Sequence, residues 1–171
     1  AQGFANFTTE ENQGRAIFFG TAGNCAACHG TDNFVPGGGA PTNNGLENPY
    51  VDKGIGDITG LAQDEGRFKV PSLRNIELTA PYMHDGRFAT LEQVVEHYNS
   101  GVVNHPNLSP PLRLPPNQGG GARRLNLTTA QKAALVAFLA GLPGLFAAPP
   151  LDRDESRFAQ ATAQMLETDD Y

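Results

Sequence analysis

Two cysteines and a histidine stand together near the start of the chain, in the run Cys25-Ala26-Ala27-Cys28-His29. Two thiols three positions apart, at the start of a helix, can each add to a vinyl group of the same porphyrin. The neighbouring imidazole can then reach the iron from one side of the ring. The pentapeptide therefore predicts one covalent c-type haem, with His29 as its proximal ligand.

Zinc binding and redox chemistry are the two alternatives for these residues. A structural zinc site needs four thiolate or imidazole ligands, but the chain has 2 cysteines and no closely spaced pair of histidines. A thioredoxin-like dithiol normally lies in a βαβ context, and no run of β-branched residues surrounds the pentapeptide. Haem attachment is therefore the favoured interpretation.

The second axial position decides whether the iron only transfers electrons, because a protein ligand closes it whereas an open position admits peroxide. The side chains that could fill it are Met83, His84, His97, Tyr98, His105 and Met165. Ligand chemistry favours Met83, since thioether is the common partner of histidine in cytochromes and the loop around it is restricted by Pro81. The alternative for Met83 is simple packing in the core.

Helical position gives a different answer for the distal ligand. His97 and Tyr98 are adjacent on a predicted helix, so only one of them can face the ring. Tyr98 falls on the apolar stripe of that helix and His97 on its polar side. We expect His84 to bond a haem propionate or a backbone carbonyl, His105 to face solvent from a loop, and Met165 to lie in an acidic tail.

The elements that must position these residues are short helices separated by long loops. Helical periodicity and capping residues predict helices over Thr9–Phe19, Ser72–Leu78, Thr90–Tyr98 and Thr129–Gly141. The stretches 30–66 and 101–127 are rich in Gly, Pro and Asn and are predicted to be irregular. We expect an all-α, cytochrome c-like domain of about four helices over residues 1–142, in which the haem forms part of the core.

The remaining residues, 143–171, are predicted to form a linker and an acidic tail with a short helix over residues 155–166. The tail is interpreted as solvated, with docking to a basic partner as the alternative. The formal net charge of −6 argues against nucleic-acid binding. No run of about 18 apolar residues is present, so we expect no membrane span.

The first residues, AQGFANF, lack the features of a signal peptide. Because c-type haem attachment takes place outside the cytoplasm, the sequence is interpreted as a mature exported protein or as a piece of a longer one. The expected location is the periplasm or another compartment outside the cytoplasm.

Two runs, Phe68 to Gly86 and Thr90 to Tyr98, closely resemble the bacterial di-haem cytochrome c peroxidase and MauG family. The resemblance covers roughly residues 8 to 141. Members of that family have two c-type haem domains, and this sequence is similar to the C-terminal one, which carries the electron-transferring haem. In the peroxidases the distal ligand is a Met fourteen residues after a motif His that corresponds to His84, and in the MauG branch it is a Tyr. The same count from His84 reaches Tyr98, so the resemblance implies Tyr98 as distal ligand, ahead of Met83.

The resemblance also implies which residues contact cofactors. Those expected at the haem, besides Cys25, Cys28 and His29, are Phe68, Pro71, Leu73, Arg74, Tyr82, Met83 and His84. The family binds calcium partly through backbone carbonyls that correspond to Thr79 and Pro81, but its remaining ligand, an Asn of the first domain, has no counterpart in this chain. If the iron were open, His84 and Asp85 would be the acid or base candidates.

Electron transfer by a single haem is the function that the sequence favours, with a redox partner protein or a second haem domain as partner. The alternative is a peroxidase or MauG-like oxidase that acts with a second haem domain or partner chain. A third class is a structural or assembly subunit whose loops and tail contact other chains, and an oligomer fits this class.

The haem prediction can be tested by mass. Produced in a host that matures c-type cytochromes, the chain should weigh one haem more than its amino acids and show a Soret band, because both thioethers survive denaturation. Intact-mass spectrometry and absorption spectroscopy measure this. An intact mass equal to that of the polypeptide alone would contradict the prediction.

Overall fold

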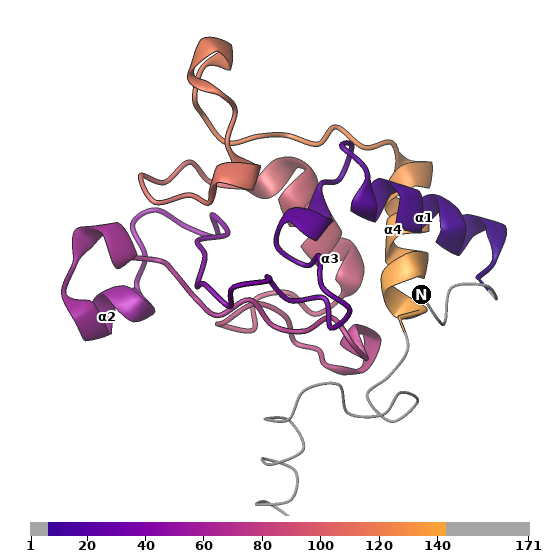
Figure 1. Cartoon of the computed structure of the whole chain (residues 1–171), viewed down its shortest axis with the longest axis horizontal. Coiled ribbons are helices and arrows are strands. Elements are labelled where there is room, and N and C mark those ends of the chain that lie inside the picture. The colour runs from indigo at the N-terminus through magenta and orange to yellow at the C-terminus, as the bar shows by residue number, and fades with distance from the viewer. Residues whose placement is uncertain (1–6, 143–171) are drawn as a thin grey trace, which may run out of the picture.

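The computed structural model describes residues 7–142, and its regular structure is helical (Figure 1). Within these residues strand-like pairing is confined to isolated bridges, such as the one between Thr42 and Phe68. The described part of the chain is therefore all-α in class. The expected linker, acidic tail and helix over 155–166, together with Met165, lie outside the described residues.

Three helices begin with the same capping box. In each, a threonine hydroxyl accepts the N–H of the third helical residue, whose side chain accepts the N–H of that threonine. The helices are α1 (Thr9–Phe19), capped by Thr8 and Glu11; α3 (Leu91–Glu96), capped by Thr90 and Gln93; and α4 (Thr129–Ala140), capped by Thr128 and Gln131. The predicted bounds of the first and last helices are confirmed to within one residue.

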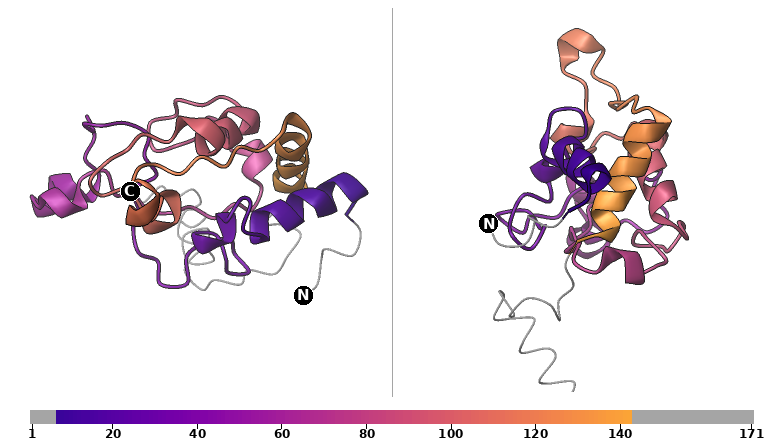
Figure 2. Two further views of the ribbon diagram at one scale, coloured as in Figure 1. Left: turned by 90° about the horizontal axis from the view of Figure 1, so that it is seen from above. Right: turned by 90° about the vertical axis from the view of Figure 1, so that its right-hand side faces the viewer.

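Helices α1 and α4 cross at a glycine, on the side of the molecule opposite α2 (Figures 1 and 2). A Cβ atom on Gly14 would lie 1.9 Å from the backbone oxygen of Ala134, so only glycine permits this approach. Beside the crossing, the rings of Phe18 and Phe138 pack with centroids 5.3 Å apart, and both are almost completely buried. This contact anchors the largest apolar cluster of the domain, which also includes residues of α3.

A short helix that the sequence did not indicate, α2 (Ile55–Thr59), lies inside the stretch 30–66 that was predicted to be irregular. It follows Gly54 and ends at Gly60, both with positive φ, so glycines bound only five helical residues. A segment this short carries too little periodicity to be recognised. Its side chains stay largely outside the core, as Ile58 illustrates.

Two predicted helices are shorter or different in the structure. The helix predicted over Ser72–Leu78 is wrong except for a 3₁₀ turn over Ile76–Leu78. The Ser72 hydroxyl instead donates to the Asn33 carbonyl at 2.7 Å and accepts the Arg74 N–H, and Asn75 takes a left-handed conformation. Local side-chain hydrogen bonds thus replace the first helical turn.

The helix predicted over Thr90–Tyr98 continues further than expected but changes its form. The α-helical part, α3, ends at Glu96, and residues His97–Gly101 form a π-helical turn. Such turns are rare and often occur at functional sites. Among residues 7–142, no helix has the length and apolar character needed to cross a membrane.

Substitution of Gly14 should test the α1 and α4 crossing. Gly14→Ala is expected to lower the free energy of unfolding by about 1–3 kcal/mol, because the new methyl group must push the two helices apart. Gly37→Ala is the matched control, since a Cβ there meets no atom within 4 Å. Denaturant unfolding followed by circular dichroism compares the two variants. Equal stability of both would contradict the close approach of the helices.

Candidate haem site

A cavity of about 580 Å³ runs through the middle of the domain, within the range typical of cofactor pockets. Its walls come from α1, the Cys25–Ala27 turn, the segment 68–84, α3 with its π turn, the loop 109–112 and α4. Most of the lining is apolar, with contributions such as Phe18, Val95, Leu135 and Leu139. Segments far apart in the sequence therefore enclose one apolar space.

Cys25 and Cys28 both line this cavity, on a 3₁₀ turn that spans Cys25–Ala27 and follows Asn24 in a left-handed conformation. Burial raises the pKa of the Cys25 thiol to about 12 and also raises the pKa of Cys28. Redox dithiols need the opposite, a thiolate stabilised at low pKa. The site therefore suits thiols that serve as anchors better than thiols that exchange.

His29 lines the same cavity, and one of its ring nitrogens is already engaged. Its Nδ1 lies 2.7 Å from the carbonyl oxygen of Phe34, to which it can donate. Burial lowers the pKa of His29, which favours a neutral imidazole, although the Phe34 hydrogen bond opposes that shift. This arrangement leaves the Nε2 lone pair for a metal, since ligating histidines commonly donate their other N–H to a carbonyl.

Tyr98 and Met83, the two expected distal ligands, also line the cavity. Burial raises the pKa of the Tyr98 phenol to about 12, and a hydrogen bond from the Asn44 side chain opposes this effect. Met83 takes a left-handed backbone conformation with φ 74°, and its sulfur accepts a hydrogen bond from Asn44 Nδ2 at 3.4 Å. Both side chains are thus available to a group in the cavity, and Asn44 contacts each of them.

His97 stays outside the cavity, as its place on the polar side of the helix predicts, but it is buried rather than solvated. The side chain is 6% exposed, and its Nε2 lies 3.0 Å from the carbonyl oxygen of Asn44. The loop that carries Asn44 covers this face of the helix, so a position on the polar side becomes buried. His97 does not line the cavity, whereas its neighbour Tyr98 does.

His105 does not face solvent, which corrects the expectation from the sequence. It is 6% exposed, its ring packs edge-on against Tyr50, and its Nδ1 accepts the N–H of Asn107 at 3.0 Å. The side-chain amide of Asn43 lies 3.3 Å from the same nitrogen. A loop rich in Pro and Asn buries this imidazole because its polar atoms find partners inside the protein.

Two buried nitrogen atoms at the cavity have no hydrogen-bond partner among the described residues. They are Nδ1 of His84 and Nε of Arg74. His84 is held flat against Phe68, with ring centroids 3.7 Å apart, while another nitrogen of Arg74 donates to the Asp32 carbonyl. Buried donors of this kind normally have partners, and haem propionates supply anionic acceptors. The lining therefore fits a haem, with its propionates near these two side chains.

The structure also places the other residues that the sequence singled out. Those in the cavity wall are Phe68, Pro71, Leu73, Tyr82, Thr79 and Pro81. Asp85 is not in the wall: its carboxylate bonds the Arg87 guanidinium, which holds the pKa of Asp85 low. Within residues 7–142 no cluster of three or more His, Cys, Asp or Glu side chains is arranged to hold a metal ion.

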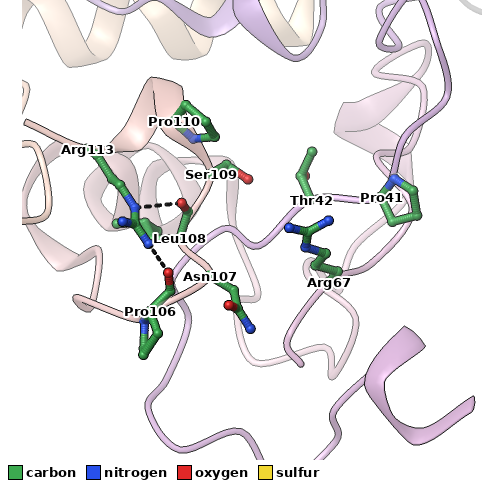
Figure 3. Close-up of a pocket in the computed structure, with 9 residues that line it drawn as sticks. All are labelled: Pro41, Thr42, Arg67, Pro106, Asn107, Leu108, Ser109, Pro110 and Arg113. Atoms are coloured by element: carbon green, nitrogen blue, oxygen red, sulfur yellow. Dashed lines mark hydrogen bonds between the residues drawn. The ribbon is translucent and has the colours of Figure 1, made fainter. Parts of the chain in front are cut away.

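A second, smaller pocket of about 350 Å³ adjoins the first, and Thr42 and Ser109 line both (Figure 3). The Arg113 side chain lines this pocket, and its guanidinium is held in place by hydrogen bonds to the carbonyls of Leu108, His105 and Pro106. Arg113 thus stabilises the loop that separates the two pockets.

Asn44 is the site residue that sequence reasoning missed. It lines the cavity, contacts both candidate distal ligands and accepts a hydrogen bond from His97. The only local signal was the run Asn43-Asn44-Gly45, which is typical of a turn and says nothing about a ligand. The Phe34 carbonyl that orients His29 was missed for the same reason, because backbone atoms leave no mark in a sequence.

Comparison with known proteins supports the haem assignment. The chain is 34% identical to the cytochrome-c peroxidase IdrP2 of Denitromonas iodatirespirans, over 80% of this chain and 40% of the relative. It is 33% identical to the methylamine utilization protein MauG of Paracoccus denitrificans, over 93% of this chain and 48% of that protein. The chain is a relative of the di-haem cytochrome c peroxidases and MauG.

Solved structures of this family share the fold. A MauG-like protein associated with microbial copper homeostasis superposes with a TM-score of 0.67 at 36% identity, over 88% of this chain and 52% of that one. The diheme peroxidase BthA from Burkholderia thailandensis superposes with a TM-score of 0.60 at 24% identity, over 84% of this chain and 44% of that one. No protein-family model matches the chain. The chain spans about two fifths to one half of the length of these relatives, as one domain of a di-haem protein does.

Removal of the Arg74 charge should test the placement of the propionates. Arg74→Gln is expected to lower the reduction potential of the haem-loaded protein by roughly tens of millivolts, because a nearby cation stabilises the electron-rich reduced form. Lys53→Gln removes the same charge from an exposed residue that does not line the cavity. Spectroelectrochemical titration measures both variants. If Lys53→Gln lowered the potential as much as Arg74→Gln, the placement of the propionates beside Arg74 would be wrong.

Proposed function

We propose that this chain is an electron-transfer domain that binds one c-type haem, with His29 as proximal and Tyr98 as distal ligand. The observation that carries the proposal is that one apolar cavity is lined by Cys25, Cys28, His29 and Tyr98 together. When bound, the haem supplies a reversible one-electron couple between ferric and ferrous iron.

The residues of the chain perform three tasks in this proposal. Cys25 and Cys28 hold the porphyrin covalently at one edge of the cavity. His29 is kept in one tautomer by the Phe34 carbonyl, so its Nε2 is free for the iron. The apolar walls exclude water, which lowers the reorganisation energy of electron transfer.

Tyr98 is preferred to Met83 for the distal position on two grounds. The phenol lies on the wall formed by the π turn, a feature often found where a helix carries a functional residue. The spacing from His84 also matches the position of the Tyr ligand in the MauG branch. An anionic, hard phenolate oxygen would favour ferric iron and a low reduction potential.

The partner we propose is a second haem domain, in the same longer chain or in a separate one. The support is the length of the chain, which covers about two fifths of the IdrP2 peroxidase, and the resemblance of its sequence motifs to the C-terminal domain of such proteins. Residues 7–142 would then pass electrons to or from the haem of the other domain. We place this function in the periplasm or another compartment outside the cytoplasm, where c-type haem is attached.

A peroxidase or MauG-like oxidase formed together with such a second domain is the alternative function. The names of the relatives favour it, because they are peroxidases and MauG proteins. His84, whose Nδ1 has no partner among the described residues, is the acid or base candidate at the cavity. In that case this chain would still contribute electron transfer, with peroxide chemistry at the other haem.

Substitution of Tyr98 should distinguish the two distal ligands. Tyr98→Phe is expected to open the sixth position, so that cyanide binds the ferric protein roughly tenfold or more tightly than it binds the unaltered protein. Met83→Leu should leave cyanide binding unchanged. Titration of the Soret band with cyanide measures both.

The reverse result would overturn the assignment. If Met83→Leu opened the position and Tyr98→Phe did not, sulfur would be the ligand. If the unaltered ferric protein bound cyanide or peroxide at once, the iron would be open and the electron-transfer proposal would fail in favour of catalysis.

A further inference from the structure

Asn44 contacts both residues that compete for the sixth position of the iron. Its Nδ2 donates to the Met83 sulfur at 3.4 Å, and the same side chain opposes the rise that burial causes in the pKa of the Tyr98 phenol. All three side chains line the same cavity.

The orientation of the Asn44 side chain is set by its neighbours. The Tyr50 hydroxyl lies 3.1 Å from Asn43 Oδ1 and 3.5 Å from Asn44 Oδ1, so its single proton is shared between these two amide oxygens, and it accepts the Leu46 N–H at 3.0 Å. This contact places the amide oxygen toward Tyr50 and the NH₂ group toward Met83. The backbone is fixed as well, because the Asn44 carbonyl lies 3.0 Å from Nε2 of His97, the residue before Tyr98.

A thioether sulfur binds iron through one of its two lone pairs, and a fixed amide donor on the other lone pair restricts the directions in which the sulfur can turn. The Met83 side chain can reach the cavity but its sulfur is engaged by an amide that is itself held in place. Tyr98, in contrast, lines the cavity wall, and the residue before it, His97, is hydrogen-bonded to the Asn44 backbone carbonyl. The arrangement favours oxygen over sulfur as sixth ligand.

We propose that Asn44 is a positioning residue that holds the Met83 sulfur away from the iron and thereby assigns the sixth position to Tyr98. This inference rests on the proposed function, since it requires a haem in the cavity with Tyr98 as its ligand. It adds the residue that decides between two competent ligands.

The test replaces the donor at position 44 and observes the ligand directly. Asn44→Leu removes both polar atoms, and Asn44→Asp keeps the shape and the acceptor toward Tyr50 but cannot donate to sulfur. Asn48→Leu is the matched control. Asn48 lies on the same loop as Asn44 and donates to the Asn104 carbonyl, but it does not line the cavity. Near-infrared magnetic circular dichroism of the ferric, haem-loaded proteins separates phenolate from sulfur charge-transfer bands.

The unaltered protein and Asn48→Leu should show the phenolate band with only a minor sulfur band, which sets the starting ratio. In Asn44→Leu and Asn44→Asp the ratio of sulfur-ligated to phenolate-ligated haem should rise about threefold to tenfold, as expected for the loss of one hydrogen bond. Adding Met83→Leu to either variant should abolish the sulfur band. Asn44→Asp keeps the test valid if Asn44→Leu fails to fold.

The outcomes separate the two proposals. A chain without covalent haem, or an unaltered protein without the phenolate band, would overturn the proposed function. A phenolate band that persists unchanged in both Asn44 variants would leave the proposed function standing and overturn the role of Asn44. A sulfur band that also rises in Asn48→Leu would overturn it too, because the effect would then belong to the loop as a whole.

Discussion

The hydrogen bond between His29 Nδ1 and the Phe34 carbonyl joins the chemistry of the site to the packing of the core. Phe34 is 4% exposed, and its ring packs against Phe18, which in turn packs against Phe138 where α1 and α4 cross. A shift of the helices would therefore move the carbonyl that orients the imidazole. The direction of the proximal ligand is set by contacts that lie well away from the pentapeptide itself.

The rest of the cavity follows from this fixed side. With the cysteines and His29 on one short turn, the remaining walls must be brought to the same space by segments from the second half of the described chain. The three capping boxes fix where α1, α3 and α4 begin, and the π turn after Glu96 carries Tyr98, which lines the cavity. Hydrogen bonds at the helix ends thus help to determine which residues line the cavity, although the cavity itself is formed by tertiary packing.

Much of this arrangement could be predicted from sequence, and the failures share a cause. The helices at Thr9–Phe19 and Thr129–Ala140 have strong caps and apolar periodicity, and the residues expected at the haem do line one cavity. The burial of His97 and of His105 was not predicted, because loops from elsewhere in the chain cover them. Asn44 was missed because its importance arises from partners such as Met83 and His97, far away in sequence. Periodicity and spacing report local geometry, and these contacts are tertiary.

The order of the cavity-lining segments along the chain has a consequence for how the protein folds. Cys25 and Cys28 are among the first described residues, whereas Leu125, Leu135 and Leu139 of the opposite wall are among the last. Bringing such distant segments together costs loop-closure entropy before any contact compensates for it. A porphyrin tethered to the cysteines in advance offers a large apolar surface on which the later segments can collapse. Covalent attachment and acquisition of the native structure would then be coupled, with the haem completing the apolar core that α1 and α4 begin.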